Sequence, residues 1–233
     1  MTSAAFISTA IGAILCVFYV AAKNKAYDLK ELALKTAVSI CFVITAVLAN
    51  KANPASIYVF VLAGLLFGLA GDVVLDLKFI DRKREDLWTY AGFISFAIGH
   101  VFYMTGLYTH YGKTVHLRYT IIAFAASLII SVAVVNFGHI LGNDYGRQKA
   151  VVGFYSFFLF SMTLMAGLYA LAFGWKEAFL NIFFAGGVLF CISDLVLSGT
   201  YYGEGHETLK DFVLNYLTYY SAQFLIALAL LAA

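Results

Sequence analysis

The chain has 233 residues, of which 63% are hydrophobic and 12% are charged, and its mean hydropathy is +0.88. Soluble domains carry about 25% charged residues, so this composition excludes a soluble globular protein and indicates a polytopic membrane protein. The net charge of +2 is too small to indicate a nucleic-acid partner. One proline and the lack of a Ser/Gly-rich linker predict a single transmembrane domain over residues 1–233.

Apolar stretches long enough to cross a membrane follow one another along the chain. A spanning helix needs about 20 mostly apolar residues. The first stretch is longer than the core of a signal peptide and no basic segment precedes it, so we expect a transmembrane helix there. The sequence predicts an all-α bundle of eight transmembrane helices at residues 4–22, 33–50, 56–76, 88–110, 118–138, 150–173, 178–199 and 212–232.

The basic residues predict the orientation of these helices. The loops that follow odd-numbered helices, with their margins, hold eleven of them: Lys23, Lys25, Lys30, Lys35, Lys78, Arg82, Lys83, Arg84, Arg147, Lys149 and Lys210. The opposite side holds four: Lys51, Lys113, Arg118 and Lys176. Because cytoplasmic loops carry an excess of Lys and Arg, we expect the odd-numbered loops in the cytoplasm and both termini on the non-cytoplasmic side.

The cysteines and the histidine-containing loop give no sign of a metal site. Cys16, Cys41 and Cys191 all lie in apolar segments, which is typical of core packing rather than of a disulfide framework. The segment YYGEGHETLKD holds Glu204, His206 and Glu207, whose spacing fits no standard zinc motif. We therefore expect no metal.

Two aspartates lie in strongly apolar stretches: Asp72 in AGLLFGLAGDVVLDL and Asp194 in AGGVLFCISDLVLSG. A carboxylate at the centre of a membrane helix costs roughly 2.5–3.5 kcal/mol on insertion scales, so such residues usually mark a functional cavity. The predicted helices at 56–76 and 178–199 run in the same direction and place each aspartate roughly 6 Å, about one turn, from the cytoplasmic end. The sequence therefore predicts two carboxyls at equal depth. Asp76, on the same face, is interpreted as an interfacial or salt-bridging residue, with a catalytic role as the alternative.

Other polar side chains are expected at a similar depth. His100 lies near the middle of its helix, with Tyr103 on the same side. The remaining groups are Asn136, Tyr155, Ser156, Asn215, Tyr216, Tyr219, Tyr220 and Gln223. They predict one polar cavity in the cytoplasmic half, lined by the third, fourth, seventh and eighth helices. The alternative role for His100 and for the Tyr and Gln side chains is hydrogen bonding between helices.

Four short stretches carry a resemblance to a known family. They are GDVVL at 71–75, GHVFY at 99–103, AGGVLFCISDLVL at 185–197 and YYSAQFLIAL at 219–228. In their order, spacing and placement on helices the chain resembles the lysoplasmalogenase family of YhhN-like integral membrane proteins. The resemblance implies hydrolysis of the vinyl ether bond of a lysoplasmalogen to a fatty aldehyde and glycerophosphocholine or glycerophosphoethanolamine. It implies a lysophospholipid substrate within membrane lipid and no cofactor.

The resemblance also implies functional roles for Gly71, Asp72, His100, Tyr103, Ser193, Asp194, Tyr220 and Gln223. Vinyl ether hydrolysis needs a carboxylic acid that protonates the β-carbon and a negative group that stabilises the cation and activates water. Burial and a second nearby carboxylate both favour the protonated form of a carboxyl. We expect Asp72 and Asp194 to be catalytic, with the acid and base assignment open. The expected substrate-binding residues are His100, Tyr103, Ser193, Asn215, Tyr219, Tyr220 and Gln223.

Three other functions fit parts of the pattern. A proton- or ion-coupled transporter would use Asp72, Asp194 and His100 as a relay. The lack of a convincing internal repeat and the bias of the polar groups to one leaflet argue against it. An intramembrane aspartyl protease also pairs two aspartates, but the glycines of GLAGD have the wrong spacing and no Pro-Ala-Leu element follows. A lipid-binding protein without turnover is the third alternative.

Overall fold

The computed structural model describes residues 2–22, 28–203 and 208–233. Within these residues the chain forms eight long helices and no strand: α1 (Thr2–Ala22), α2 (Leu29–Ala52), α3 (Tyr58–Ile80), α4 (Glu85–Tyr111), α5 (Leu117–Phe137), α6 (Lys149–Ala172), α7 (Ala178–Tyr202) and α8 (Leu209–Ala229). All eight are long and apolar enough to cross a membrane, judged by length and composition. The prediction of an all-α, eight-helix membrane protein is confirmed.

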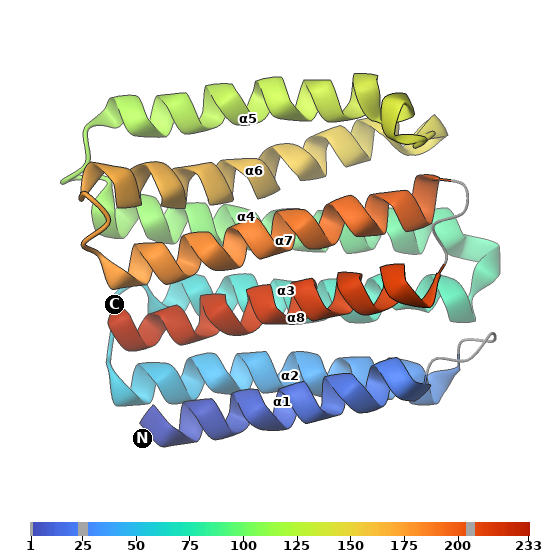
Figure 1. The fold of residues 1–233 in the computed structure, drawn as a ribbon, viewed down its shortest axis with the longest axis horizontal. Coiled ribbons are helices and arrows are strands. Elements are labelled where there is room, and N and C mark those ends of the chain that lie inside the picture. Colours follow the sequence, from blue (N-terminus) through green and yellow to red (C-terminus); the bar gives the residue numbers. More distant parts are fainter. Residues whose placement is uncertain (1, 23–27, 204–207) are drawn as a thin grey trace.

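The helices lie side by side, with α1 and α2 along one edge and α5 along the other (Figure 1). Five of them close a ring, because α3 packs on α4, α4 on α6, α6 on α7, α7 on α8, and α8 on α3. Outside this ring α2 packs against α3 and α8, and α1 packs against α2 and α8. At the far edge α5 packs against α6. The side chains that line the ring are therefore shielded from lipid.

Both termini lie at the same end of the bundle (Figure 1). The C-terminal ends of α3, α5 and α7 lie at the opposite end, which is the end that the basic residues predict to be cytoplasmic. Two of those basic residues are buried inside the bundle, because Lys35 lies well within α2 and Lys78 within α3. Lys23 and Lys25 lie outside the described residues.

Some helices begin or end at residues other than the predicted ones, because a capping box or additional helical turns extend them. The predicted second helix began at residue 33, whereas α2 begins at Leu29. Asp28 accepts hydrogen bonds from the backbone N–H groups of Lys30 and Glu31, and the Glu31 carboxylate accepts from the Asp28 N–H. This is a capping box, and it satisfies the free N–H groups of the first turn.

The carboxyls lie deeper in the bundle than the sequence predicted. The predicted third and seventh helices ended at residues 76 and 199, whereas α3 continues to Ile80 and α7 to Tyr202. Asp72 and Asp194 are therefore each eight residues from the end of their helix, which is about 12 Å rather than 6 Å. Their offsets from the helix ends are equal, as predicted.

The approach of α4 to α3 depends on small residues. A Cβ atom added to Gly99 on α4 would lie 2.9 Å from the backbone oxygen of Gly64 on α3. Backbone atoms cannot move away as the end of a flexible side chain can. These two glycines therefore set the distance between α4 and α3, the helix that carries Asp72.

We expect Gly99→Val to lower the thermal unfolding midpoint in detergent by several degrees, because the new side chain forces α4 away from α3. Ala125→Val, on an exposed part of α5, is the matched control and should leave the midpoint unchanged. Equal midpoints for the two variants would contradict the close approach. Circular dichroism against temperature measures both.

Candidate active site

Asp72 and Asp194 line the same pocket inside the five-helix ring. This pocket, called the polar pocket below, has a cavity volume of about 30 Å³. Phe93 and Phe96 of α4 form much of its aromatic wall. Its polar lining consists of Lys35, Asp72, Tyr155, Ser193, Asp194, Tyr201, Asn215, Tyr216 and Tyr219. The lining thus includes α2 and α6 as well as the four helices that the sequence predicted.

Several donors converge on Asp72, which is 2% exposed. Its Oδ2 accepts a hydrogen bond of 2.6 Å from the Ser39 hydroxyl and one of 2.7 Å from the Tyr219 hydroxyl. The ammonium of Lys35 lies 3.7 Å from its Oδ1. Hydroxyl donors and a nearby cation stabilise a charged carboxylate in a medium that otherwise disfavours it.

Lys35 also pairs with Asp76, one helical turn beyond Asp72. The Nζ to Oδ1 distance is 2.6 Å, and the exposed fractions of the two residues are 3% and 1%. Asp76 is therefore a buried salt-bridging residue, in agreement with the salt-bridging interpretation of the sequence. Lys35 was counted among the orienting lysines, and the structure shows it as the cation between two carboxylates.

Asp194 has a different environment. It is part-buried, and its Oδ2 accepts a hydrogen bond from the Tyr155 hydroxyl. Among the described residues, no recorded hydrogen bond joins Asp194 directly to Asp72. Each carboxyl thus has its own partners within a shared pocket.

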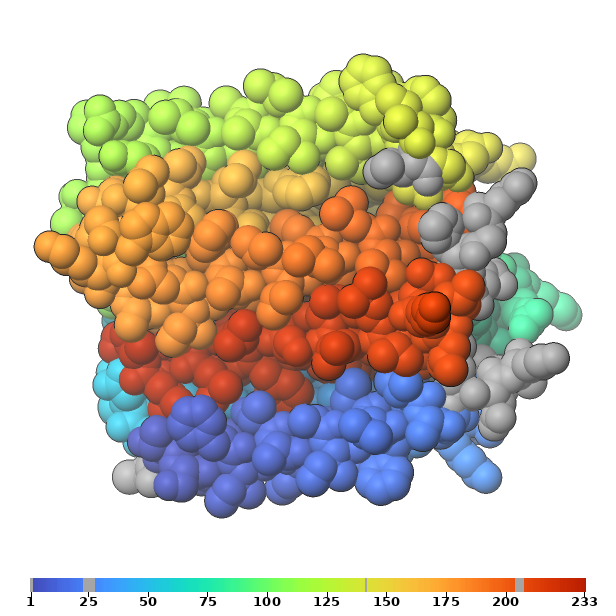
Figure 2. Space-filling view, in the orientation of Figure 1, coloured from blue at the N-terminus to red at the C-terminus, as the bar shows by residue number. Residues whose placement is uncertain are grey.

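A second, larger pocket meets the polar pocket at Asp194. Its cavity volume is about 170 Å³, and its wall is formed mainly by α5, α6 and α7. Figure 2 shows α6 set back between α5 and α7 on this face. We call it the apolar pocket; its lining includes Phe93, Phe137, Asn143, Tyr145, Val152, Tyr155, Ser156, Leu159, Phe160, Cys191, Asp194, Leu197, Ser198 and Tyr201. The residues that line both pockets are Phe93, Tyr155, Asp194, Leu197 and Tyr201.

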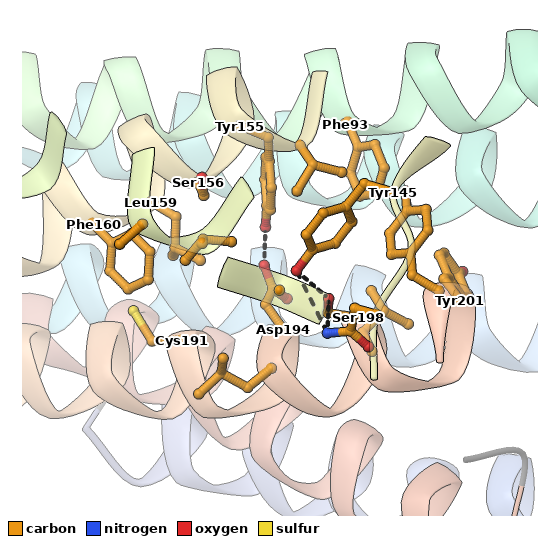
Figure 3. A pocket seen from close by; sticks show the side chains of 18 of the residues that line it. Phe93, Tyr145, Tyr155, Ser156, Leu159, Phe160, Cys191, Asp194, Ser198 and Tyr201 are labelled. Atoms are coloured by element: carbon orange, nitrogen blue, oxygen red, sulfur yellow. Dashed lines mark hydrogen bonds between the residues drawn. The ribbon is translucent and has the colours of Figure 1, made fainter. Parts of the chain in front are cut away.

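The apolar pocket runs lengthwise along α6 and α7. Figure 3 shows Leu159, Phe160 and Cys191 on one side of the Tyr155–Asp194 pair, and Ser198 and Tyr201 on the other. Ser198 and Tyr201 lie nearer the end of α7. The pocket therefore has an apolar end deep in the bundle and a more polar end near the C-terminal end of α7. The carboxyl of Asp194 lies between the two ends.

Three of the expected substrate-binding residues connect to Asp72 in a chain. Tyr219 lines the polar pocket and bonds Asp72 directly. The Gln223 amide donates to the Tyr219 hydroxyl at 3.0 Å, and the Tyr103 hydroxyl donates to Gln223 Oε1 at 3.5 Å. Gln223 and Tyr103 are not among the lining residues of either pocket. Their hydrogen bonds hold the Tyr219 side chain in place from the side away from the pocket.

Three further expected residues hold helices together. The Asn215 amide donates to the backbone oxygen of Ser193 at 2.8 Å and to its hydroxyl at 3.0 Å, which joins α8 to α7 within the wall of the polar pocket. The Tyr220 hydroxyl donates to the backbone oxygen of Lys35 at 3.3 Å. Tyr220 thereby positions the segment of α2 that carries the cation.

His100 does not line either pocket, in contrast to the cavity that the sequence predicted. It is 1% exposed, and neither ring nitrogen has a hydrogen-bond partner. Its ring centroid lies 5.6 Å from that of Tyr155 and 5.1 Å from that of Phe190. Helical periodicity correctly predicts that His100 faces the inside of the bundle. The rings of Tyr155 and Phe190 lie between its imidazole and the pockets.

One other polar expectation differs from the structure. Asn136 is exposed and accepts a hydrogen bond from Lys149, so it is no part of the cavity. No group of three metal-ligating side chains occurs in the described parts of the chain. Glu204, His206 and Glu207 lie outside those parts.

The sequence profile of the YhhN family matches residues 30–230. The chain belongs to the YhhN family. This family includes lysoplasmalogenases, so membership supports a lysoplasmalogenase-like function at the level of the family. No curated protein and no solved structure matches the chain.

The match begins in the first turn of α2 and therefore covers every side chain of this YhhN protein that touches Asp72 or Asp194. Sequence reasoning missed Lys35 and Ser39 among them. The signal was present: Asp28 and Glu31 form a D-x-x-E capping-box pattern that starts the helix early. A helix from Leu29 carries Lys35 nearly two turns inside, with Ser39 one turn further on the same face.

We expect Lys35→Met to lower the free energy of unfolding by about 3–5 kcal/mol, because removing one partner leaves buried carboxylates without their cation. Adding Asp76→Asn to that variant should restore part of the loss, since it removes one of the two negative charges. Chemical denaturation in detergent measures the difference. Lys51→Met, exposed at the other end of α2, is the control; a Lys35→Met protein as stable as this control would contradict the buried pair.

Proposed function

We propose that this YhhN protein hydrolyses the vinyl ether bond of lysoplasmalogens to a fatty aldehyde and a glycerophosphocholine or glycerophosphoethanolamine. One observation carries the proposal: Asp194 lies where an elongated apolar pocket meets a polar pocket that holds a second carboxyl. Membership in the family supports the reaction class. The distribution of basic residues supports a site in the cytoplasmic half of the membrane.

The shape of the apolar pocket suits a single-chain amphiphile. The alkenyl chain lies toward Leu159 and Phe160, at the deep end, and the glycerol lies toward Ser198, near the bundle surface. This is the orientation that a lysolipid already has in the membrane. The vinyl ether group then lies beside Asp194, and water approaches from the polar pocket.

The two carboxyls have surroundings that suit different protonation states. Asp72, with two hydroxyl donors and an ammonium nearby, suits the ionised base. Asp194, with one phenol donor and an apolar wall, suits the neutral acid. Tyr155 donates to Oδ2 of Asp194, which leaves Oδ1 to carry the transferable proton. Two carboxyls with unlike surroundings commonly divide acid and base roles in this way.

The reaction proceeds in three steps that restore both residues. Asp194 transfers its proton to the β-carbon of the vinyl ether, which gives an oxocarbenium ion next to the new carboxylate. Water adds to the α-carbon and loses a proton to Asp72, which gives a hemiacetal. The hemiacetal hydroxyl then returns a proton to Asp194 as the C–O bond to glycerol breaks, and Asp72 protonates the departing glycerol oxygen.

Asp72→Asn and Asp194→Asn should each lower aldehyde release from lysoplasmenyl-ethanolamine by at least about 100-fold, the usual contribution of a general acid or base. Asn is close to Asp in shape, so both variants should still express and fold in detergent, although Asp72→Asn removes one partner of the buried Lys35 and should melt at a lower temperature. Asp86→Asn, exposed on α4, should retain full activity. Full activity in both pocket variants would contradict the proposal. Coupled ion flux in liposomes without release of aldehyde would favour a transporter.

Leu159→Trp should shift the preference of the enzyme toward shorter alkenyl chains, because the larger side chain fills the deep end of the apolar pocket. We expect kcat/KM to fall for an octadecenyl substrate and to change little for an octenyl one. Leu128→Trp, on the exposed face of α5, is the control. Equal falls for both chain lengths would contradict this placement of the chain.

A further inference from the structure

Three neutral polar side chains form a cluster at the surface-proximal end of the apolar pocket. The Asn143 amide donates to the Ser198 hydroxyl at 3.1 Å, and the Tyr145 and Ser198 hydroxyls are also 3.1 Å apart. The same amide lies 3.5 Å from the Tyr145 hydroxyl. All three residues line the pocket. We call them the amide–hydroxyl cluster.

One acceptor of this cluster lacks a hydrogen bond. Oδ1 of Asn143 is buried and has no partner, and the residue as a whole is 7% exposed. The large majority of buried polar groups in proteins have a partner, so a buried amide oxygen without one is unusual. A ligand that brings a hydrogen-bond donor into the pocket would supply the missing partner.

The chemistry of the cluster selects the kind of donor. None of its three side chains carries a charge, and Asp194 is the one acidic or basic residue in the wall of this pocket among the described residues. A phosphate would call for cations and an ammonium for a carboxylate. An amide oxygen beside two hydroxyls suits a neutral hydroxyl, which donates one hydrogen bond and accepts another.

The position of the cluster matches one hydroxyl of the proposed substrate. Ser198 follows Asp194 by one turn of α7, about 6 Å along the helix. Figure 3 shows Tyr145 and Ser198 joined by a hydrogen bond on the side of Asp194 away from Leu159. In a lysoplasmalogen five bonds separate the β-carbon from the sn-2 oxygen, and an extended chain of five such bonds also reaches about 6 Å.

We propose that the amide–hydroxyl cluster binds the free sn-2 hydroxyl of the lysolipid glycerol and so selects lysolipids over two-chain plasmalogens. The inference rests on the proposed function. The sn-2 hydroxyl donates to Asn143 Oδ1 and accepts from Tyr145 or Ser198. An acyl group at sn-2 removes that hydrogen, and binding then leaves the amide oxygen unpartnered. Sites built around a substrate hydroxyl discriminate strongly against analogues that lack it, because the buried polar groups of the site are then left without a partner.

The test compares aldehyde release from lysoplasmenyl-ethanolamine and from its sn-2 deoxy analogue. For the wild-type enzyme we expect kcat/KM to be about 10- to 100-fold higher with the hydroxyl, the range expected for one buried group left without a partner. Asn143→Leu should bring that ratio to about one by lowering the rate with the hydroxyl substrate alone. Asn143→Asp keeps an acceptor and should keep a ratio above about ten.

Ser131→Ala is the matched control. Ser131 is buried and its hydroxyl also lacks a partner, but it is not among the residues that line the pocket. Its removal should leave the ratio unchanged.

A wild-type ratio near one would overturn this inference and leave the proposed function standing, as would equal losses with both substrates in Asn143→Leu. Aldehyde from neither substrate would overturn the proposed function itself. The wild-type ratio is measured without any variant, so it tests this inference even if Asn143→Leu fails to fold.

Discussion

A carboxylate is stable inside an apolar bundle only where donors or a cation face it, and this constraint shapes the centre of the molecule. Asp72 lies on α3, but the groups that stabilise it come from α2 and α8: the Lys35 ammonium, the Ser39 hydroxyl and the Tyr219 hydroxyl. These three helices pack against one another, and each contributes to the environment of this one charge. The same lysine neutralises Asp76, and Tyr220 holds the backbone of that lysine in place.

The remaining helices build the other half of the site around Asp194. Its phenol partner comes from α6, and the apolar pocket beside it needs α5 to close the outer wall. One carboxyl thus lies in a dense polar network and the other at the edge of an apolar channel. Acid–base chemistry on a lipid needs this contrast, because the reacting bond lies between an apolar chain and a polar head.

The sequence predicted the parts of the site that depend on one helix alone. Asp72 and Asp194 were evident because a charge within an apolar run is costly and usually marks a functional site, and their equal depth followed from helix direction. The sequence did not show what meets them across helix boundaries. Helical periodicity predicts that His100 faces inward, but only packing shows that Tyr155 and Phe190 screen it from the pockets. Asn143 and Tyr145 lie between α5 and α6, and no periodicity places such residues beside a pocket.

In the proposed mechanism a carboxyl delivers a proton to carbon rather than to oxygen. Hydrolysis in deuterium oxide tests it directly, since a proton placed on the β-carbon of the vinyl ether stays in the aldehyde. We expect each released aldehyde to carry one deuterium on the carbon next to the carbonyl, as read by mass spectrometry after immediate reduction to the alcohol. Aldehyde released without deuterium on that carbon would contradict it.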